Sequence, residues 1–162
     1  MMLMTKKLKL NPNVSYVLGL YQCSPDKEVG IVTQSEDLVQ KFTKLLIDEF
    51  GVAPNKILLS EDGKETKVMT YNSSLKKLLN GALERKLKIF KWKNAYSGNY
   101  VAGLFDSNGG ADSQGLYIRG LVESDEMLLE RLGIHTFKKG GKSYFLNQGA
   151  LVSFIMEYSL RF

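Results

Sequence analysis

The chain has 162 residues, the length of one compact domain or of two small halves that share a core. Apolar residues make up 44% and charged residues 24%, which argues against a disordered or fibrous chain. The single cysteine, Cys23, excludes an internal disulfide and a cysteine-based zinc site, and no apolar run approaches the roughly 18 residues that span a bilayer. We expect an intracellular protein, cytoplasmic or nucleoid-associated, with neither signal peptide nor membrane anchor.

Positive charge is concentrated in the first part of the chain. The formal net charge is +5, and residues 1–93 carry 16 basic and 10 acidic side chains, whereas residues 94–162 carry 6 and 7. A basic surplus favours anionic partners such as nucleic acid. The densest basic run fits either a solvated helix end or a set of phosphate contacts, and it consists of Arg85, Lys86, Lys88, Lys91 and Lys93.

Hydrophobic periodicity predicts alternating helices and strands in the first half. Ser35 is a typical helix N-cap and Gly51 is suited to a left-handed C-cap. The expected elements are a helix over 14–22, a strand over 28–34, a helix over 36–50, a hairpin of strands 56–59 and 67–71 that turns at 61–63, and a helix capped by Ser73 or Ser74 that extends through residue 87.

The second half repeats this order of elements. Residues 16–21 match residues 100–105 at an offset of 84, with aromatic, small and glycine positions in common. The expected elements are a helix that contains this match, a strand over 115–121, a helix from Ser124 to Gly133, a hairpin of strands 136–139 and 142–146, and a last helix from Ala150.

Gly19 and Gly103 occupy equivalent places in the two matching helices. A glycine inside a helix costs about 1 kcal/mol relative to alanine, so both positions need a packing reason. We expect the two helices to pack closely through these glycines at a pseudo-twofold axis, with one shared core.

Residues 101–109, with the sequence VAGLFDSNG, resemble the nine-residue signature of the LAGLIDADG homing endonucleases, and a degenerate copy lies at 17–25. The resemblance implies an α+β fold of two pseudo-symmetric αβαββα halves, over residues 1–93 and 94–162. It also implies that the LAGLIDADG-like helices pair and that antiparallel sheets form a saddle facing the major groove of DNA.

The family's metal-binding acids fall on Ser24 and Asn108, and neither residue is a carboxylate. Hard divalent cations prefer charged oxygen ligands, so we expect no metal site, no cofactor and no confidently assigned catalytic residue. Asp106 lies two residues before Asn108, which turns its side chain by roughly 200° toward the opposite helix face. We interpret Asp106 as a structural or capping carboxylate.

Two alternatives stay open. Glu28 and Asp112 correspond at the offset of 84 and lie four residues beyond the lost acids, so they are, together with Asp106, the rescue candidates for an active Mg²⁺-dependent endonuclease. A protein-interaction module on the same scaffold is the second alternative, favoured by the slightly negative second half. Our principal hypothesis is a monomer that binds double-stranded DNA, has no membrane partner and has lost cleavage.

The expected DNA contacts lie on strands and hairpin turns. Arg119 shares a strand face with Tyr117 and matches the two acceptors of guanine, although pairing with Glu123 is an equally good interpretation. Because residues 26–34 and 110–122 leave room for little more than one strand apiece, we expect a narrow saddle. The expected DNA-binding set is Lys27, Thr33, Gln34, Lys64, Lys67, Tyr117, Arg119, Lys138, Lys139 and Lys142.

Other chemistry has little support in the sequence. His135 is the only histidine and has no acid-base partner at a catalytic spacing. Cys23 has no basic neighbour before Lys27, and it is far from His135 in the sequence. The glycines between residues 98 and 110 do not follow a strand in a phosphate-binding pattern, so we expect no nucleotide cofactor.

Overall fold

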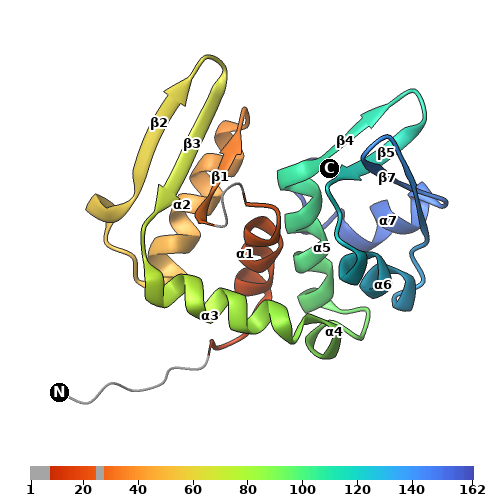
Figure 1. Cartoon of the computed structure of the whole chain (residues 1–162), viewed down its shortest axis with the longest axis horizontal. Coiled ribbons are helices and arrows are strands. Elements are labelled where there is room, and N and C mark those ends of the chain that lie inside the picture. The colour runs from red at the N-terminus through yellow and green to blue at the C-terminus, as the bar shows by residue number, and fades with distance from the viewer. Residues whose placement is uncertain (1–7, 25–27) are drawn as a thin grey trace.

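The computed structural model describes residues 8–24 and 28–162, which form two sheets on either side of a central pair of helices (Figure 1). The first part of the chain contains α1 (Pro12–Gln22), β1 (Val29–Thr33), α2 (Glu36–Phe50), the 3-10 turn η2 (Pro54–Lys56), β2 (Leu58–Asp62), β3 (Glu65–Thr70), α3 (Ser73–Glu84) and α4 (Lys86–Ile89). The rest contains α5 (Ala95–Asn108), β4 (Gly109–Asp112), β5 (Gly115–Arg119), α6 (Glu123–Arg131), β6 (Thr136–Lys139), β7 (Lys142–Phe145) and α7 (Gln148–Ile155).

The two sheets repeat one antiparallel topology. The first has the strand order β1-β3-β2, and the second has β4-β5-β7-β6, so that β5-β7-β6 repeats the first sheet. The β2–β3 and β6–β7 hairpins each lead into a helix capped by an asparagine: Asn72 accepts from the Leu75 amide, and Asn147 accepts from the Ala150 amide. The structure confirms the expected α+β class.

Helices α1 and α5 lie side by side at the centre of the molecule (Figure 1). A Cβ atom on Gly19 would clash with Tyr100 O and lie 2.9 Å from Leu104 N, and one on Gly103 would clash with Tyr16 O. The contact is therefore reciprocal, and each glycine makes room for the backbone of the other helix.

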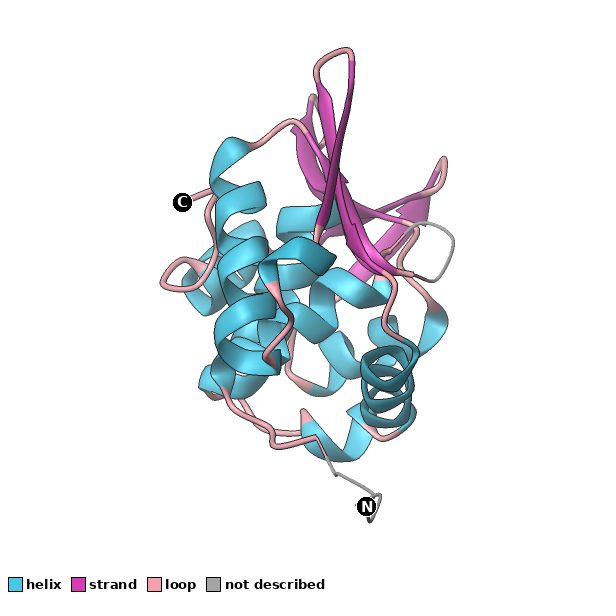
Figure 2. Ribbon diagram, turned by 90° about the vertical axis from the view of Figure 1, so that its left-hand side faces the viewer, coloured by secondary structure: helices cyan, strands magenta, loops and turns pink. Residues whose placement is uncertain are grey.

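The core is continuous across this helix pair. A single cluster of buried apolar side chains contains residues of both helices and of both sheets. The helices gather on one side and the strands rise away from them, as the turned view shows (Figure 2). None of the helices in the described ranges combines the length and apolar content that crossing a membrane requires.

The structure corrects several expected element boundaries. Gly109–Asp112 forms a strand that pairs with β5, so the segment after α5 is a hairpin and not a single strand. The helix after the first hairpin is capped by Asn72, not by a serine, and ends at Glu84. Helix α6 begins at Glu123 without a side-chain cap, and α7 begins at Gln148 and ends at Ile155. The errors in the helices lie at their ends, where short polar residues compete for the same cap.

The close helix contact predicts a specific mutational sensitivity. Gly19→Ala puts a methyl group into the backbone of α5, and we expect it to lower the free energy of unfolding by about 3 kcal/mol, at the upper end of overpacking effects. Urea denaturation followed by circular dichroism measures this change.

Gly81→Ala is the matched control, since a Cβ atom there has only the end of the Arg85 side chain within 4 Å, at 3.9 Å. We expect this variant to be neutral or stabilised by up to about 1 kcal/mol. A Gly19→Ala protein as stable as the control would contradict the reciprocal packing.

Candidate functional site

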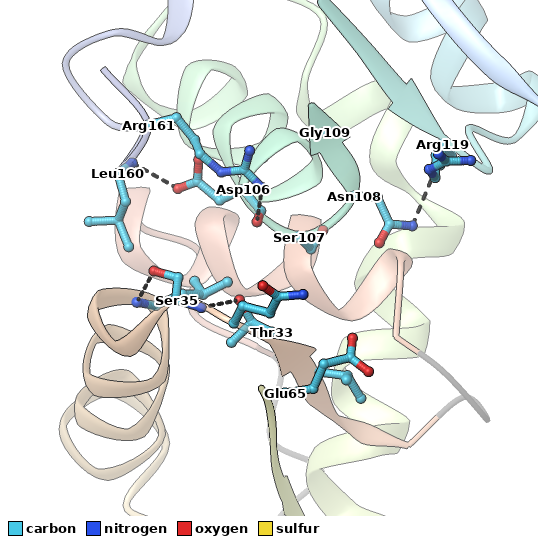
Figure 3. Close-up of a pocket in the computed structure, with 13 residues that line it drawn as sticks. Thr33, Ser35, Glu65, Asp106, Ser107, Asn108, Gly109, Arg119, Leu160 and Arg161 are labelled. Atoms are coloured by element: carbon cyan, nitrogen blue, oxygen red, sulfur yellow. Dashed lines mark hydrogen bonds between the residues drawn. The ribbon is translucent and has the colours of Figure 1, made fainter. Parts of the chain in front are cut away.

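A cleft of about 640 Å³ opens between the two halves where α5 ends (Figure 3). Both sheets border it, since Val32 and Glu65 line it from the first sheet and Arg119 from the second. A smaller cavity of about 340 Å³, lined by Cys23 and Ser24 among others, shares Val32, Ser107 and Asn108 with this cleft. The ends of the paired helices thus meet at one continuous depression.

Ser24 and Asn108, which occupy the positions of the family's acids, both lie at this depression. The Ser24 hydroxyl donates a hydrogen bond to the carbonyl of Glu28. The Asn108 side-chain amide donates to the carbonyl of Arg119 at 3.3 Å (Figure 3). Ser24 therefore connects the end of α1 to the residue before β1, and Asn108 connects the end of α5 to the end of β5.

Asp106 is 3% exposed, and several groups donate to its carboxylate. Tyr16 Oη donates to one oxygen at 2.5 Å, and Ser159 Oγ donates to the other at 2.5 Å. The Leu160 amide donates at 2.9 Å, and the Arg161 guanidinium donates to the Asp106 carbonyl at 3.4 Å. Asp106 thus joins α1, α5 and residues 159–161, which is the structural role expected from its place on the helix.

The donor set at the cleft does not fit a divalent metal ion. Among residues 8–24 and 28–162, no group of three or more His, Cys, Asp and Glu side chains could hold one. Serine and asparagine are neutral, and the carboxylate of Asp106 already accepts three hydrogen bonds. A hard cation would have to displace these bonds in a buried position, at a cost of several kcal/mol.

Glu28 lies just before β1 and Asp112 lies at the end of β4, in separate ion pairs. Glu28 accepts from Lys76 Nζ at 3.0 Å. Asp112 accepts from Lys142 Nζ at 2.9 Å and from Tyr144 Oη at 2.7 Å, and these donors lower the pKa of Asp112 to about 2. In the part of the chain that the structure describes, neither carboxylate lines the cleft or the adjoining cavity.

The second sheet presents two chemically distinct rows on its outer face. Cα partners in antiparallel strands share a face, so Tyr117, Tyr144 and Phe137 form one row across β5, β7 and β6. The next row on this face consists of Arg119, Lys142 and Lys139. Ile118 and Ser143, on the opposite face, are buried against the helices.

The outer face of the first sheet is much less basic. Val32, Lys67 and Ser60 are Cα partners on this face, and the next row toward the turn is Glu65 and Asp62. Two carboxylates therefore accompany one lysine, whereas the second sheet has three cations and the carboxylate of Asp112. The first half of the sequence is the more basic half, yet the second sheet has the more basic outer face.

The structure places most of the expected DNA-binding residues at the outer faces or the cleft. Thr33 and Gln34 line the cleft, Lys64 lies in the turn after β2, and Tyr117, Arg119, Lys139 and Lys142 lie on the second sheet. Lys27 lies outside the described residues. Among those described, Arg119 has no ion pair, to Glu123 or to any other carboxylate, and its guanidinium lies 5.5 Å from the Tyr117 ring centroid.

Lys138 lies on the other face of the second sheet from the remaining expected residues of that sheet. Its register partner is Ser143, which faces the helices, and Lys138 Nζ pairs with Glu126 of α6 at 3.2 Å. Strand alternation places Lys138 and Lys139 on opposite faces, so only Lys139 lies on the outer face.

Phe137, Glu65 and Arg161 were not among the site residues expected from the sequence. Phe137 was detectable, since it alternates with Lys139 along a predicted strand. Glu65 was not, because the first hairpin turns later than the sequence indicated. Arg161 had no signal, because only the fold brings it from beyond α7 to the cleft.

The basic run lies at the opposite end of α5 from the cleft, and one of its lysines is structural. Lys86 is 6% exposed and pairs with Asp125 at 2.9 Å, and its Nζ also donates to Gln22 Oε1 at 3.1 Å. Tyr100 Oη donates to the same Asp125 oxygen at 2.7 Å. Neither interpretation of the run holds for Lys86, which joins α4, α1 and α6.

The fold matches solved structures of the homing endonuclease I-DmoI. A structure of its mesophilic variants matches with a TM-score of 0.67 and 18% identity over 90% of this chain and 96% of that chain. The structure of I-DmoI in complex with DNA and Mn matches with a TM-score of 0.68 and 18% identity, over 92% of this chain and 98% of that chain. The complex with DNA and Ca matches with a TM-score of 0.66 and 18% identity, over 91% of this chain and 88% of that chain. The sequence matches no protein-family model and no curated protein. The resemblance is thereby confirmed at the level of the fold.

Cys23 lines the cavity beside Ser24, and we predict that its thiol reacts slowly because it is largely buried. Burial raises the pKa of the Cys23 thiol to about 11, although a hydrogen bond with Ser107 opposes the shift. At pH 8 about 0.1% is then thiolate, against about a quarter for an ordinary cysteine of pKa about 8.5. We expect alkylation by iodoacetamide at pH 8 to be about 100-fold slower in the folded protein than in denaturant, and to accelerate up to pH 10 and beyond. A rate that levels off below pH 9 would contradict this assignment.

Proposed function

We propose that this protein binds double-stranded DNA across its two sheets and does not cleave it. The observation that carries the proposal is the arrangement around the cleft: both outer faces border the ends of the paired helices, and Ser24 and Asn108 stand there in place of carboxylates. I-DmoI, whose fold this chain shares, has been solved in complex with DNA and Mn. The likeness in fold supports a comparable placement of the duplex here.

The outer faces supply the contacts that such binding needs. Arg119 is exposed, and its planar guanidinium suits the two acceptors of guanine in the major groove. Lys64, Lys67, Lys139 and Lys142 suit phosphates, which set the position of the protein on DNA without reading sequence. Because Lys142 is paired with Asp112, the remaining cations contribute more to phosphate neutralisation.

The donor set at the cleft supports the proposed loss of cleavage. Cleavage assisted by a metal needs an ion that activates water and neutralises the developing charge on the phosphate. Ser24 and Asn108 donate hydrogen bonds to backbone carbonyls, and Asp106 holds three donors. These interactions serve the fold and supply no charged oxygen cluster to a metal.

Duplex binding at several salt concentrations, with and without Mg²⁺, tests the proposal. We expect retention of a randomised duplex pool that weakens with salt, with a slope of log K against log salt of about −4 if four to five phosphates are neutralised. The strands should stay uncut in both conditions. Arg119→Ala should weaken binding about tenfold or more, since a bidentate contact to a base contributes about 1–3 kcal/mol.

Arg131→Ala is the control, because it removes the same charge from the end of α6, away from the outer faces. No retention of the duplex at low salt would contradict DNA binding and favour the protein-interaction module. Mg²⁺-dependent scission that Glu28→Gln or Asp112→Asn abolishes would establish the endonuclease alternative and overturn the proposed loss of cleavage.

A further inference from the structure

We propose that the outer face of the β4–β7 sheet also binds unpaired nucleotides, with the exposed Phe137 at the end of its aromatic row stacking on a base and its cationic row contacting phosphates. Single-stranded nucleic acid is the ligand class. This proposal uses one sheet only and does not depend on duplex binding across both sheets. We name this face the aromatic platform and define it by Tyr117, Tyr144, Phe137, Arg119, Lys142 and Lys139.

The three rings form an unbroken row across three strands. Tyr117 and Tyr144 meet edge to face with ring centroids 5.8 Å apart, and Phe137 stacks on Tyr144 at 5.5 Å. Phe137, at the outer end of the row, is 41% exposed, whereas Tyr144 in the middle is 4% exposed. The buried Tyr144 thus holds the ring of Phe137, whose exposed surface remains available to a base.

Gly110 on β4 lies next to Tyr117 in the same row, and its lack of a side chain makes space for the Tyr117 ring. It is the Cα partner of Tyr117, and a Cβ atom there would lie 2.5 Å from Tyr117 Oη. The tyrosine ring therefore leans over the backbone of β4, which widens the aromatic surface toward the end of α5. Any larger residue at this position would displace the ring.

The cations lie one row further along the same face. Residues two apart on a strand are separated by roughly 6.8 Å, so the charges stand beside the rings and within reach of a nucleotide's phosphate. Lys142 Nζ lies 4.3 Å from the Tyr117 ring centroid. Asp112 fixes both rows, because it accepts from Lys142 and from Tyr144. The platform is thus ordered before a ligand binds.

This chemistry favours unpaired over paired bases. A duplex presents base edges in its grooves, whereas the faces of its bases are stacked on one another. Aromatic rings on a sheet, next to basic side chains, stack on the faces of single-stranded bases with little regard to sequence. The outer face of the first sheet is built from aliphatic and polar residues at the equivalent rows, so we assign this activity to the second sheet alone.

Fluorescence anisotropy with labelled oligothymidylate and oligoadenylate tests the platform, alongside a duplex of matched length. Stacking contributes about 1–3 kcal/mol per base, so Phe137→Leu should weaken single-strand binding at least fivefold. Duplex affinity should change less than twofold. Phe137→Tyr keeps a ring and should bind like the unsubstituted protein.

Tyr96→Leu is the matched control, since Tyr96 is exposed to a similar extent, 39%, but lies at the start of α5. Quenching of 2-aminopurine in the oligonucleotide reports stacking directly and should be lost in Phe137→Leu. Unchanged single-strand affinity in Phe137→Leu, or equal losses for single strand and duplex, would overturn the platform. Lys67→Ala separates the two proposals, because it removes the first sheet's lysine and should weaken duplex binding only.

Discussion

The approach of two helix backbones through Gly19 and Gly103 is the constraint on which the rest of this structure depends. Because neither position has a side chain, α1 and α5 meet closely enough for the backbone of each to occupy the space of the other's missing Cβ atom. That contact brings the ends of both helices to one depression and sets the sheets that follow them on either side. A larger residue at either position would separate the sheets as well as the helices. The geometry of the cleft is therefore determined by the packing of the two helices and not by the polar residues that line it.

Polar residues at the helix ends then serve the fold. Asp106 is a carboxylate near the expected metal position, yet it accepts from Tyr16 of the other half and from residues 159 and 160. Burial and the negative charge of Asp106 raise the pKa of Tyr16 well above its ordinary value, so Tyr16 remains a donor throughout the physiological range. A carboxylate whose lone pairs are occupied in this way stabilises the contact between halves and has little left to offer a cation.

Helices and strands with a strong apolar periodicity were predictable from the sequence, and so was the repetition of their order in the second half. The helix at Glu36–Phe50 has its Ser35 cap and a left-handed Gly51 where the sequence indicated them, because local chemistry alone fixes both ends. Gly109–Asp112 was not predictable as a strand, since it has two glycines and its pairing with β5 comes from the register of the hairpin. Lys86 in a basic run gave no sign of burial, because its partner Asp125 is 39 residues away along the chain. Long-range partners and faces are settled by topology, which no short window contains.

The distribution of charge over the surface was also not predictable from the sequence, and this distribution affects where DNA can bind. The sequence assigns the positive surplus to residues 1–93, yet the outer face of the first sheet has two carboxylates and one lysine, while the second sheet has Arg119, Lys139 and Lys142 with one carboxylate. Much of the first half's positive charge lies on helices and turns, and Lys86 is neutralised in the interior. A polyanion that approaches the cleft therefore meets its strongest attraction on the less basic half of the chain. Because the aromatic row lies on that same face, recognition of bases and attraction of phosphates are concentrated on one sheet, and the other sheet contributes shape more than charge.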